Sequence, residues 1–287
     1  MVRLAVLGAG RIGGEVAYLS SVLSLVDELV IYDANKPFLH SQVLDLQHTG
    51  LDIPISTDPW EASRADICVF SAGIPRTPAI RTRADLLGAN LPVATECSKP
   101  LSRFGGVLIT VTNPMDANNY YLCRHNRLDR SKCIGFGGQV DSARFRLALG
   151  RHRIGGEAWV LGDHGEHQVP VFSRLSVPVP VPDREEILAG LRRASMEVIE
   201  GKGGTVFGPA YHIARLIRMV VRDERELVAC SCVLEGEYGM DGCSLGVPAR
   251  IGREGILRIE EWDLDDWERQ GLGRAGEFIR DLSRGLR

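Results

Sequence analysis

The stretch that decides the fold is "RLAVLGAGRIGG" at residues 3–14. An apolar run leads directly into three glycines with the spacing GxGxxG, and a helical pattern follows. Glycine is needed there for a tight turn, for backbone approach to a pyrophosphate and for close packing of helix on strand. The helix N-terminus adds N–H donors and positive potential. The stretch therefore predicts a dinucleotide site formed by Gly8, Gly10, Arg11, Ile12 and Gly13. The simpler alternative is a glycine turn that serves only the packing of the helix on the strand.

Asp33 supplies the second part of this prediction. It ends the next apolar run, "ELVIYDA" at 28–34, and lies twenty residues beyond the third glycine. A carboxylate at this distance is placed to accept hydrogen bonds from the adenine ribose, and it would repel a 2′-phosphate. Ala34 follows and no arginine stands beside it, so NAD is favoured over NADP.

The rest of the first half repeats the same alternation of strand and helix. Short β-branched runs at 66–73, 106–114 and 133–138 are separated by longer helical patterns. This order predicts βαβ units and a parallel sheet buried on both faces, with ligands at the carboxyl ends of its strands. The predicted fold class is α/β: a Rossmann-type doubly wound parallel sheet in an NAD-binding domain at 1–138, then an α+β substrate-binding and catalytic domain at 139–287.

The second half has a different pattern. A helix is expected near 139–150, and "VPVPVPD" at 177–183 predicts an exposed loop or edge segment. Asp183 and Glu186 have the spacing of a capping box, which predicts a helix from there to about Gly201. A further helix is expected over 209–222, then antiparallel strands and an amphipathic helix from about residue 263.

Composition excludes several classes of protein. With 287 residues, 44% of them hydrophobic, and a net charge of −3, the chain can bury a full core and is not expected to bind nucleic acid or an anionic membrane surface. Seven cysteines without a CxxC pair favour a reduced cytoplasm over a disulfide framework. The apolar run at 16–26 is too short to cross a bilayer. We therefore expect a cytoplasmic protein.

Three further motifs carry chemistry, although each has an ordinary reading when taken alone. "LGDHGEHQ" at 161–168 contains His164 and His167, but with no cysteine nearby it gives little support for a metal, and none is predicted. "DSARF" places Asp141 and Arg144 at i and i+3, which also suits a surface ion pair. "IPRTPAIRTRADL" contains three arginines, which also suits a solvated basic loop: Arg76, Arg81 and Arg83.

Together these motifs resemble the L-malate dehydrogenases of the lactate-dehydrogenase-like type. The resemblance runs through nearly the whole chain, in the family's order and near its spacing. It rests on the glycine loop, Asp33, "SAGIPR", "TRADLLGAN", "VTNPMD", "VDSAR", "GDHG", "GGTVFGPA" and "GEYG…GVPARIG". The resemblance implies interconversion of malate and oxaloacetate with NAD, as in the tricarboxylic acid cycle.

The resemblance also implies residue roles. His164 would be the acid–base group, and Asp141 would orient its ring and stabilise its protonated form. Arg144 would hold the C1 carboxylate of the substrate by a bidentate contact, and Arg83 would polarise the carbonyl. Asn113 would orient the substrate beside the nicotinamide. The other implied positions line the cofactor site (Asn90 and Val111) and the substrate pocket (Thr205).

Substrate choice depends on Arg76. Malate enzymes place arginine there for the second carboxylate, whereas the related lactate enzymes have a neutral residue. The loop between Arg76 and Arg83 is one residue longer here than in the common form of the family, which leaves Arg81 as an alternative. Arg76 is favoured because it keeps its place after "SAGIP".

The expected partner is thus a small-molecule dicarboxylate. The alternatives are a lactate or broader 2-hydroxy-acid dehydrogenase on the same fold, and a non-catalytic NAD-binding module. Relatives of this type assemble as dimers or tetramers, so a homo-oligomer is expected.

Overall fold

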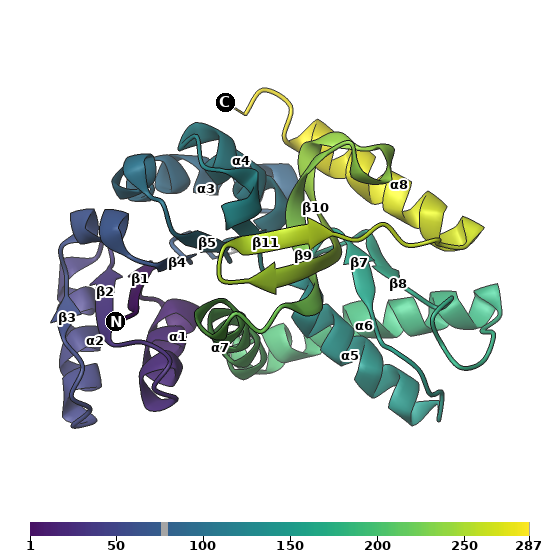
Figure 1. Ribbon diagram of the computed structural model, residues 1–287. Helices are drawn as coiled ribbons and strands as arrows, with labels where there is room; N and C mark the ends of the chain where they lie inside the picture. The colour runs from purple at the N-terminus through teal and green to yellow at the C-terminus, as the bar shows by residue number, and fades with distance from the viewer. Residues whose placement is uncertain (76–79, 287) are drawn as a thin grey trace.

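The computed structural model describes residues 1–75 and 80–286, and one mixed sheet organises them (Figure 1). Its strand order is β3-β2-β1-β4-β5-β6-β9-β10-β7-β8, and β11 pairs with β10. Within the described ranges, no helix is both long enough and apolar enough to cross a membrane.

The first six strands are all parallel and follow the doubly wound order 3-2-1-4-5-6. They are β1 (Arg3–Leu7), β2 (Glu28–Tyr32), β3 (Ile55–Ser56), β4 (Ile67–Phe70), β5 (Val107–Thr110) and β6 (Cys133–Gly135). Helices α1 (Arg11–Val22) and α2 (Lys36–His48) lie on one face, and α3 (Arg83–Cys97) and α4 (Met115–His125) lie on the other (Figure 1). The predicted Rossmann fold is confirmed.

The second half adds antiparallel strands to the same sheet. It contains α5 (Gly138–Arg151), β7 (Val160–Gly162), β8 (Gln168–Pro170), α6 (Val181–Lys202), α7 (Phe207–Arg222), β9 (Glu226–Glu235), β10 (Asp241–Gly252), β11 (Gly255–Ile259) and α8 (Asp266–Leu282). Across both halves, the described residues also form short 3-10 helices at Pro59–Arg64, Lys99–Arg103, Arg130–Lys132 and Glu237–Gly239. The parallel and antiparallel parts meet where Gly135 of β6 pairs with Ser231 of β9.

This junction combines close backbone packing with a buried polar network. A Cβ on Gly135 would lie 2.6 Å from the Cβ of Ser231, so only glycine permits the approach. The Ser231 hydroxyl lies 2.8 Å from that of Ser244, which accepts a 2.9 Å bond from the Asn119 amide. The Thr110 hydroxyl donates to the other end of that amide. The network satisfies polar groups that would otherwise be costly to bury.

One predicted helix start is wrong. Helix α6 begins at Val181, its N-cap is Pro180, and no side chain caps it, so Asp183 and Glu186 form no capping box. The cause is the proline-rich lead-in, because Pro182 in the first turn has a fixed φ suited to a helix and needs no N–H partner. A capping box does form at the start of α8, between Asp265 and Glu268.

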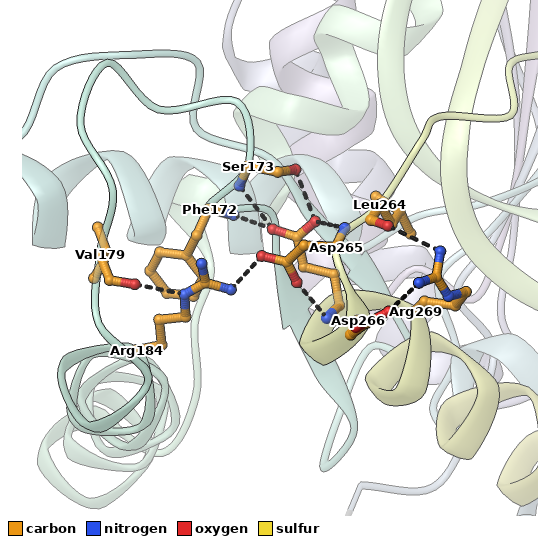
Figure 2. Close-up of polar contacts among 9 residues, drawn as sticks. Phe172, Ser173, Val179, Arg184, Leu264, Asp265, Asp266 and Arg269 are labelled. Carbon is orange, nitrogen blue, oxygen red and sulfur yellow. Dashed lines mark hydrogen bonds and ion pairs between the residues drawn. The ribbon is translucent and has the colours of Figure 1, made fainter.

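The Asp265–Glu268 capping box also anchors α8 to the rest of the second half. Glu268 is fully buried and accepts 2.7 Å bonds from the backbone N–H groups of Phe172 and Ser173 and from the Ser173 hydroxyl. Arg184 of α6 pairs with Asp265 at 2.5 Å (Figure 2). Three segments are thus held by two carboxylates, each of which has its oxygens matched to donors.

All seven cysteines are free and buried. Burial raises the pKa of the Cys68 thiol, and it raises the pKa of Cys243 to about 11. These two thiols therefore stay protonated at neutral pH, which makes them poor nucleophiles.

Candidate active site

The glycine loop leaves backbone atoms accessible at the carboxyl end of β1. Gly8 has φ +101°, and a Cβ there would lie 2.3 Å from the backbone N of Ala72. A Cβ on Gly13 would lie 2.0 Å from the Gly8 carbonyl oxygen, which explains the close packing of α1. A Cβ on Gly10, by contrast, would meet no atom of the described residues within 4 Å. The open space at residue 10 suits the approach of a pyrophosphate.

The N-terminus of α1 is free to bind an anion. Its N-cap is Gly10, and no side chain in the described part of the chain forms a capping hydrogen bond there. These groups and the helix dipole are the usual means of binding a phosphate. Arg11 is the first helical residue and is exposed, while Ile12 is half-buried against the core. The donor set therefore fits the cofactor predicted from sequence.

Asp33 lies beside this loop at the end of β2. One carboxylate oxygen accepts from the Ala9 N–H at 3.0 Å, and the other accepts from the Asn35 N–H at 2.9 Å. A carboxylate has about four acceptor positions, so two bonds leave capacity for a ribose hydroxyl. The same side chain thus holds the glycine loop and stays half-exposed to a ligand.

The side chains of His164 and Arg144 both contact the carboxylate of Asp141 on α5. Its Oδ2 lies 2.7 Å from His164 Nδ1, and its Oδ1 accepts from Arg144 Nη1 at 2.8 Å. The Asp141 side chain is 3% exposed, whereas that of His164 is 21% exposed. The carboxylate is therefore enclosed while part of the imidazole can reach a substrate.

The protonation of this cluster follows from competing effects. Burial alone lowers the pKa of His164, but the charge and hydrogen bond of Asp141 outweigh it, and the net pKa is raised. Burial alone raises the pKa of Asp141, but the charge and hydrogen bond of His164 and the charge of Arg144 leave it lowered. His164 can therefore carry a proton near neutral pH and give it up.

Arg83 reaches the same place from the first residue of α3. Its Nη2 donates to the His164 carbonyl oxygen at 2.9 Å. The guanidinium crosses Gly165, where a Cβ would lie 1.7 Å from that nitrogen. The sequence motif gave no role to this glycine, yet the path of Arg83 depends on it. Gly137 has a similar role, because a Cβ there would lie 2.5 Å from the His164 ring.

Asn90 and Asn113 form a connected pair of positions near the strand ends. Asn90 is buried, and its amide donates to the Asn113 carbonyl at 2.8 Å. Its Oδ1 accepts from the Ile74 N–H at 2.6 Å. Asn113 is exposed, and Val111, just beyond β5, is half-buried. The Asn90 side chain thus holds backbone segments, and Asn113 presents its own side chain.

Thr205 and Arg76 complete the predicted positions. Thr205 is half-buried in the segment between α6 and α7, two residues after Gly203. Arg11 donates to the Gly203 carbonyl at 3.1 Å, so this segment lies against the glycine loop. Arg76 lies outside the described residues.

Asp116 was not singled out from the sequence. It is 1% exposed, and its Oδ2 accepts the backbone N–H of His164 at 2.8 Å. Burial and the nearby charge of Asp163 raise its pKa to about 6. It lies in the "VTNPMD" motif, but only the folded chain brings its carboxylate into contact with the His164 backbone.

His167 has contacts that suit a structural residue. Its ring lies 4.5 Å from that of Phe278, and its Nδ1 is 3.7 Å from the Asp163 carboxylate. Asp163 also accepts the backbone N–H groups of residues 166 and 167, which closes the turn. No group of three or more His, Cys, Asp or Glu side chains in the described part of the chain could hold a metal ion.

Two sequence profiles match the two halves. Residues 2–135 match the lactate/malate dehydrogenase NAD binding domain. Residues 139–281 match the lactate/malate dehydrogenase alpha/beta C-terminal domain.

Individual relatives match along almost their whole length. The malate dehydrogenase of Halobacterium salinarum is 38% identical over 298 residues, with 97% of each chain covered. L-lactate dehydrogenase 1 of Peribacillus psychrosaccharolyticus is 30% identical, with 98% of this chain and 95% of the relative covered. The structure of malate dehydrogenase from Archaeoglobus fulgidus in complex with NADH superposes with a TM-score of 0.90 at 30% identity, covering 99% of both chains. The chain belongs to the lactate/malate dehydrogenase family.

Proposed function

We propose that this protein is an NAD-dependent malate dehydrogenase. The observation that carries the proposal is the cluster at Asp141, where one buried carboxylate binds both an imidazole and a guanidinium. An acid–base group and a carboxylate-binding group are the two functions that reduction of a 2-oxo acid requires. The relatives named malate dehydrogenase, and the profile of the NAD binding domain, support the same activity.

Each residue of the site would have its own role in the reaction. The glycine loop and Asp33 would hold NAD(H), which would supply or accept the hydride. His164 donates its proton to the substrate oxygen in reduction and recovers it in oxidation. Asp141 stabilises the imidazolium, because its charge raises the pKa of that ring. Arg83 places positive charge where the carbonyl oxygen becomes negative. Asn113 would orient the substrate.

Substrate recognition would use the two carboxylates of the dicarboxylate. Arg144 is 17% exposed, so its guanidinium can pair with Asp141 and still present N–H groups to the C1 carboxylate. The second carboxylate would be held by Arg76, with Arg81 as the alternative. Thr205 would line the pocket, and Asn90 and Val111 would line the cofactor site beside Asp33 and the glycine loop.

The same proposal extends to the domain boundary, the location of the protein in the cell and its assembly. We put the boundary between the NAD-binding and substrate-binding domains between residues 138 and 139, in the first turn of α5, the helix that carries Asp141. We also propose that the protein acts in the cytoplasm, takes part in the tricarboxylic acid cycle and assembles as a dimer or tetramer.

The test is to follow NADH absorbance with oxaloacetate and pyruvate in parallel, then to repeat both with NADPH. We expect rapid oxidation with oxaloacetate and NADH only. Turnover chiefly with pyruvate would keep the His164 chemistry and overturn the dicarboxylate specificity. Tight NADH binding without turnover of either substrate would instead identify a non-catalytic NAD-binding module.

The role of Arg76 needs its own variant. An Arg76→Gln variant should lose preference for oxaloacetate over pyruvate, because the second carboxylate loses its partner. An Arg81→Gln variant serves as the matched comparison. A shift with the second variant alone would move the role to Arg81.

A further inference from the structure

Arg11 connects two segments that belong to different halves of the chain. It begins α1 within the glycine loop, and its Nη1 donates to the carbonyl oxygen of Gly203, 192 residues further along. A Cβ on Gly203 would lie 3.1 Å from the same nitrogen. The guanidinium therefore lies directly against the backbone between α6 and α7, and helices α1 and α7 pack together beside it (Figure 1).

The segment that Arg11 contacts is weakly held by its own residues. Gly203 and Gly204 have φ of +77° and +146°, in the region that favours glycine, so they end α6 without side chains to pack. The N-cap of α7, Val206, provides no side-chain hydrogen bond. Thr205 lies between them. A contact from another part of the chain can therefore influence where this segment lies.

The same guanidinium has capacity for a second partner. Arginine carries five N–H donors, and one hydrogen bond from Arg11 to the described residues is present. The neighbouring acceptor would be an anion at the uncapped N-terminus of α1, beside the open space at Gly10. A planar guanidinium suits both a phosphate and a carbonyl oxygen.

We propose that Arg11 couples cofactor binding to the substrate pocket by bridging the cofactor diphosphate and the Gly203 carbonyl. Bound cofactor neutralises and orders the guanidinium, and the ordered guanidinium fixes the Gly203–Thr205 segment. The inference rests on the proposed function for the role of Thr205, but the bridge itself requires only dinucleotide binding. Because Arg11 is exposed, the coupling should be modest, about three- to tenfold in affinity.

The first experiment is hydrogen exchange of the segment containing residues 201–206, with and without saturating NADH. Exchange should slow on NADH binding in the wild-type protein and change little in Arg11→Gln. Arg124→Gln is the matched control, because Arg124 is also exposed on a first-half helix and lies at the opposite end of α4 from the site. Equal protection in Arg11→Gln and wild type, with NADH bound to both, would overturn the bridge.

Fragment binding separates the bridge from a purely structural contact. Arg11→Gln should lose about three- to tenfold affinity for ADP-ribose, which contains the diphosphate, and keep its affinity for adenosine. Equal losses for both fragments would indicate a distorted pocket and contradict the proposal. Arg11→Lys should keep most of the ADP-ribose affinity, since its charge remains, but lose the protection of residues 201–206.

A coupling measurement extends the test to the substrate. In the wild type, hydroxymalonate, a dicarboxylate that cannot be reduced, should increase NADH affinity, and by linkage NADH should increase its affinity equally. In Arg11→Gln the factor by which each ligand raises the affinity for the other should fall toward one. If oxaloacetate proves not to be a substrate, the proposed function fails, whereas the exchange result with NADH alone still decides the bridge.

Discussion

The glycine-loop region, here called the cofactor end, and the region around His164, here called the substrate end, are formed in different ways. The cofactor end is based on the glycine loop at residues 8–13 with Asp33 beside it, and close packing excludes a side chain at Gly8 and Gly13. The substrate end uses charged side chains from separate elements, with Arg83 contacting His164 across 81 positions of sequence. One end is thus determined by local backbone geometry, and the other by tertiary contacts that fix protonation. Changes at the two ends should therefore affect different quantities.

The largest expected effect is on chemistry at the substrate end. His164→Asn should reduce turnover by about 10²–10⁴-fold, because no group remains to transfer the proton. NADH affinity should stay within about twofold, since the glycine loop is untouched. Stopped-flow turnover and NADH fluorescence measure the two quantities.

The control for this variant is His167→Asn, which changes a histidine three residues away whose ring packs at a tilt against that of Phe278. It should retain most turnover. Full activity in His164→Asn would show that His164 is not the acid–base group. It would also contradict the inferred difference between the two ends, because turnover would then not depend on this side chain.

A second variant tests steric dependence at the substrate end. Gly165→Ala places a methyl group 1.7 Å from the present position of Arg83 Nη2 and should displace the guanidinium. A displacement of about 1 Å near reacting atoms can cost about 10²-fold in turnover. The matched control is Gly88→Ala on α3, where the added carbon meets no atom within 4 Å. Similar turnover for both variants would show that Arg83 need not cross residue 165.

A third pair of variants separates folding from binding at the cofactor end. Gly10→Ala should leave the midpoint of thermal unfolding nearly unchanged, because its Cβ faces open space, but weaken NADH binding by about tenfold. Gly8→Ala should lower the midpoint, since its Cβ meets the Ala72 backbone and its φ is positive. Calorimetry and fluorescence titration provide the readouts. Equal NADH affinity in Gly10→Ala and wild type would mean that the diphosphate does not approach residue 10.

The smallest expected effect concerns Asp116. Its charge contributes to the raised pKa of His164, so Asp116→Asn should lower that pKa. The reduction of oxaloacetate requires protonated His164, and its pH profile should therefore fall at a lower pH. An unchanged profile would exclude this electrostatic role.

Asp116 should also leave a signature in stability. Its pKa is 3.8 ordinarily and about 6 in the folded chain, so the folded state binds more protons between these values. The stability from this group is fully present below the lower value and is lost as pH rises through about 6. Asp116→Asn should remove that slope from the free energy of unfolding.

The sequence analysis specified more of the cofactor end than of the contacts around His164. A glycine spacing and a carboxylate at the next strand end are local signals, and the alternation of strand and helix patterns predicted the parallel sheet. The roles of Gly165 and Asp116 depend on contacts with Arg83 and with the His164 backbone, which no local pattern specifies. The start of α6 was predicted wrongly because Asp183 and Glu186 have capping spacing, while the preceding prolines begin the helix earlier.

The burial of all seven thiols provides an internal reporter of unfolding. A colour-forming disulfide reagent should react slowly with the native protein and rapidly with seven groups once the chain opens. Four of them lie in the first half (Cys68, Cys97, Cys123 and Cys133), whereas three lie in the second (Cys230, Cys232 and Cys243). Mass spectrometry of the labelled fragments would therefore show which half opens first, without any engineered probe.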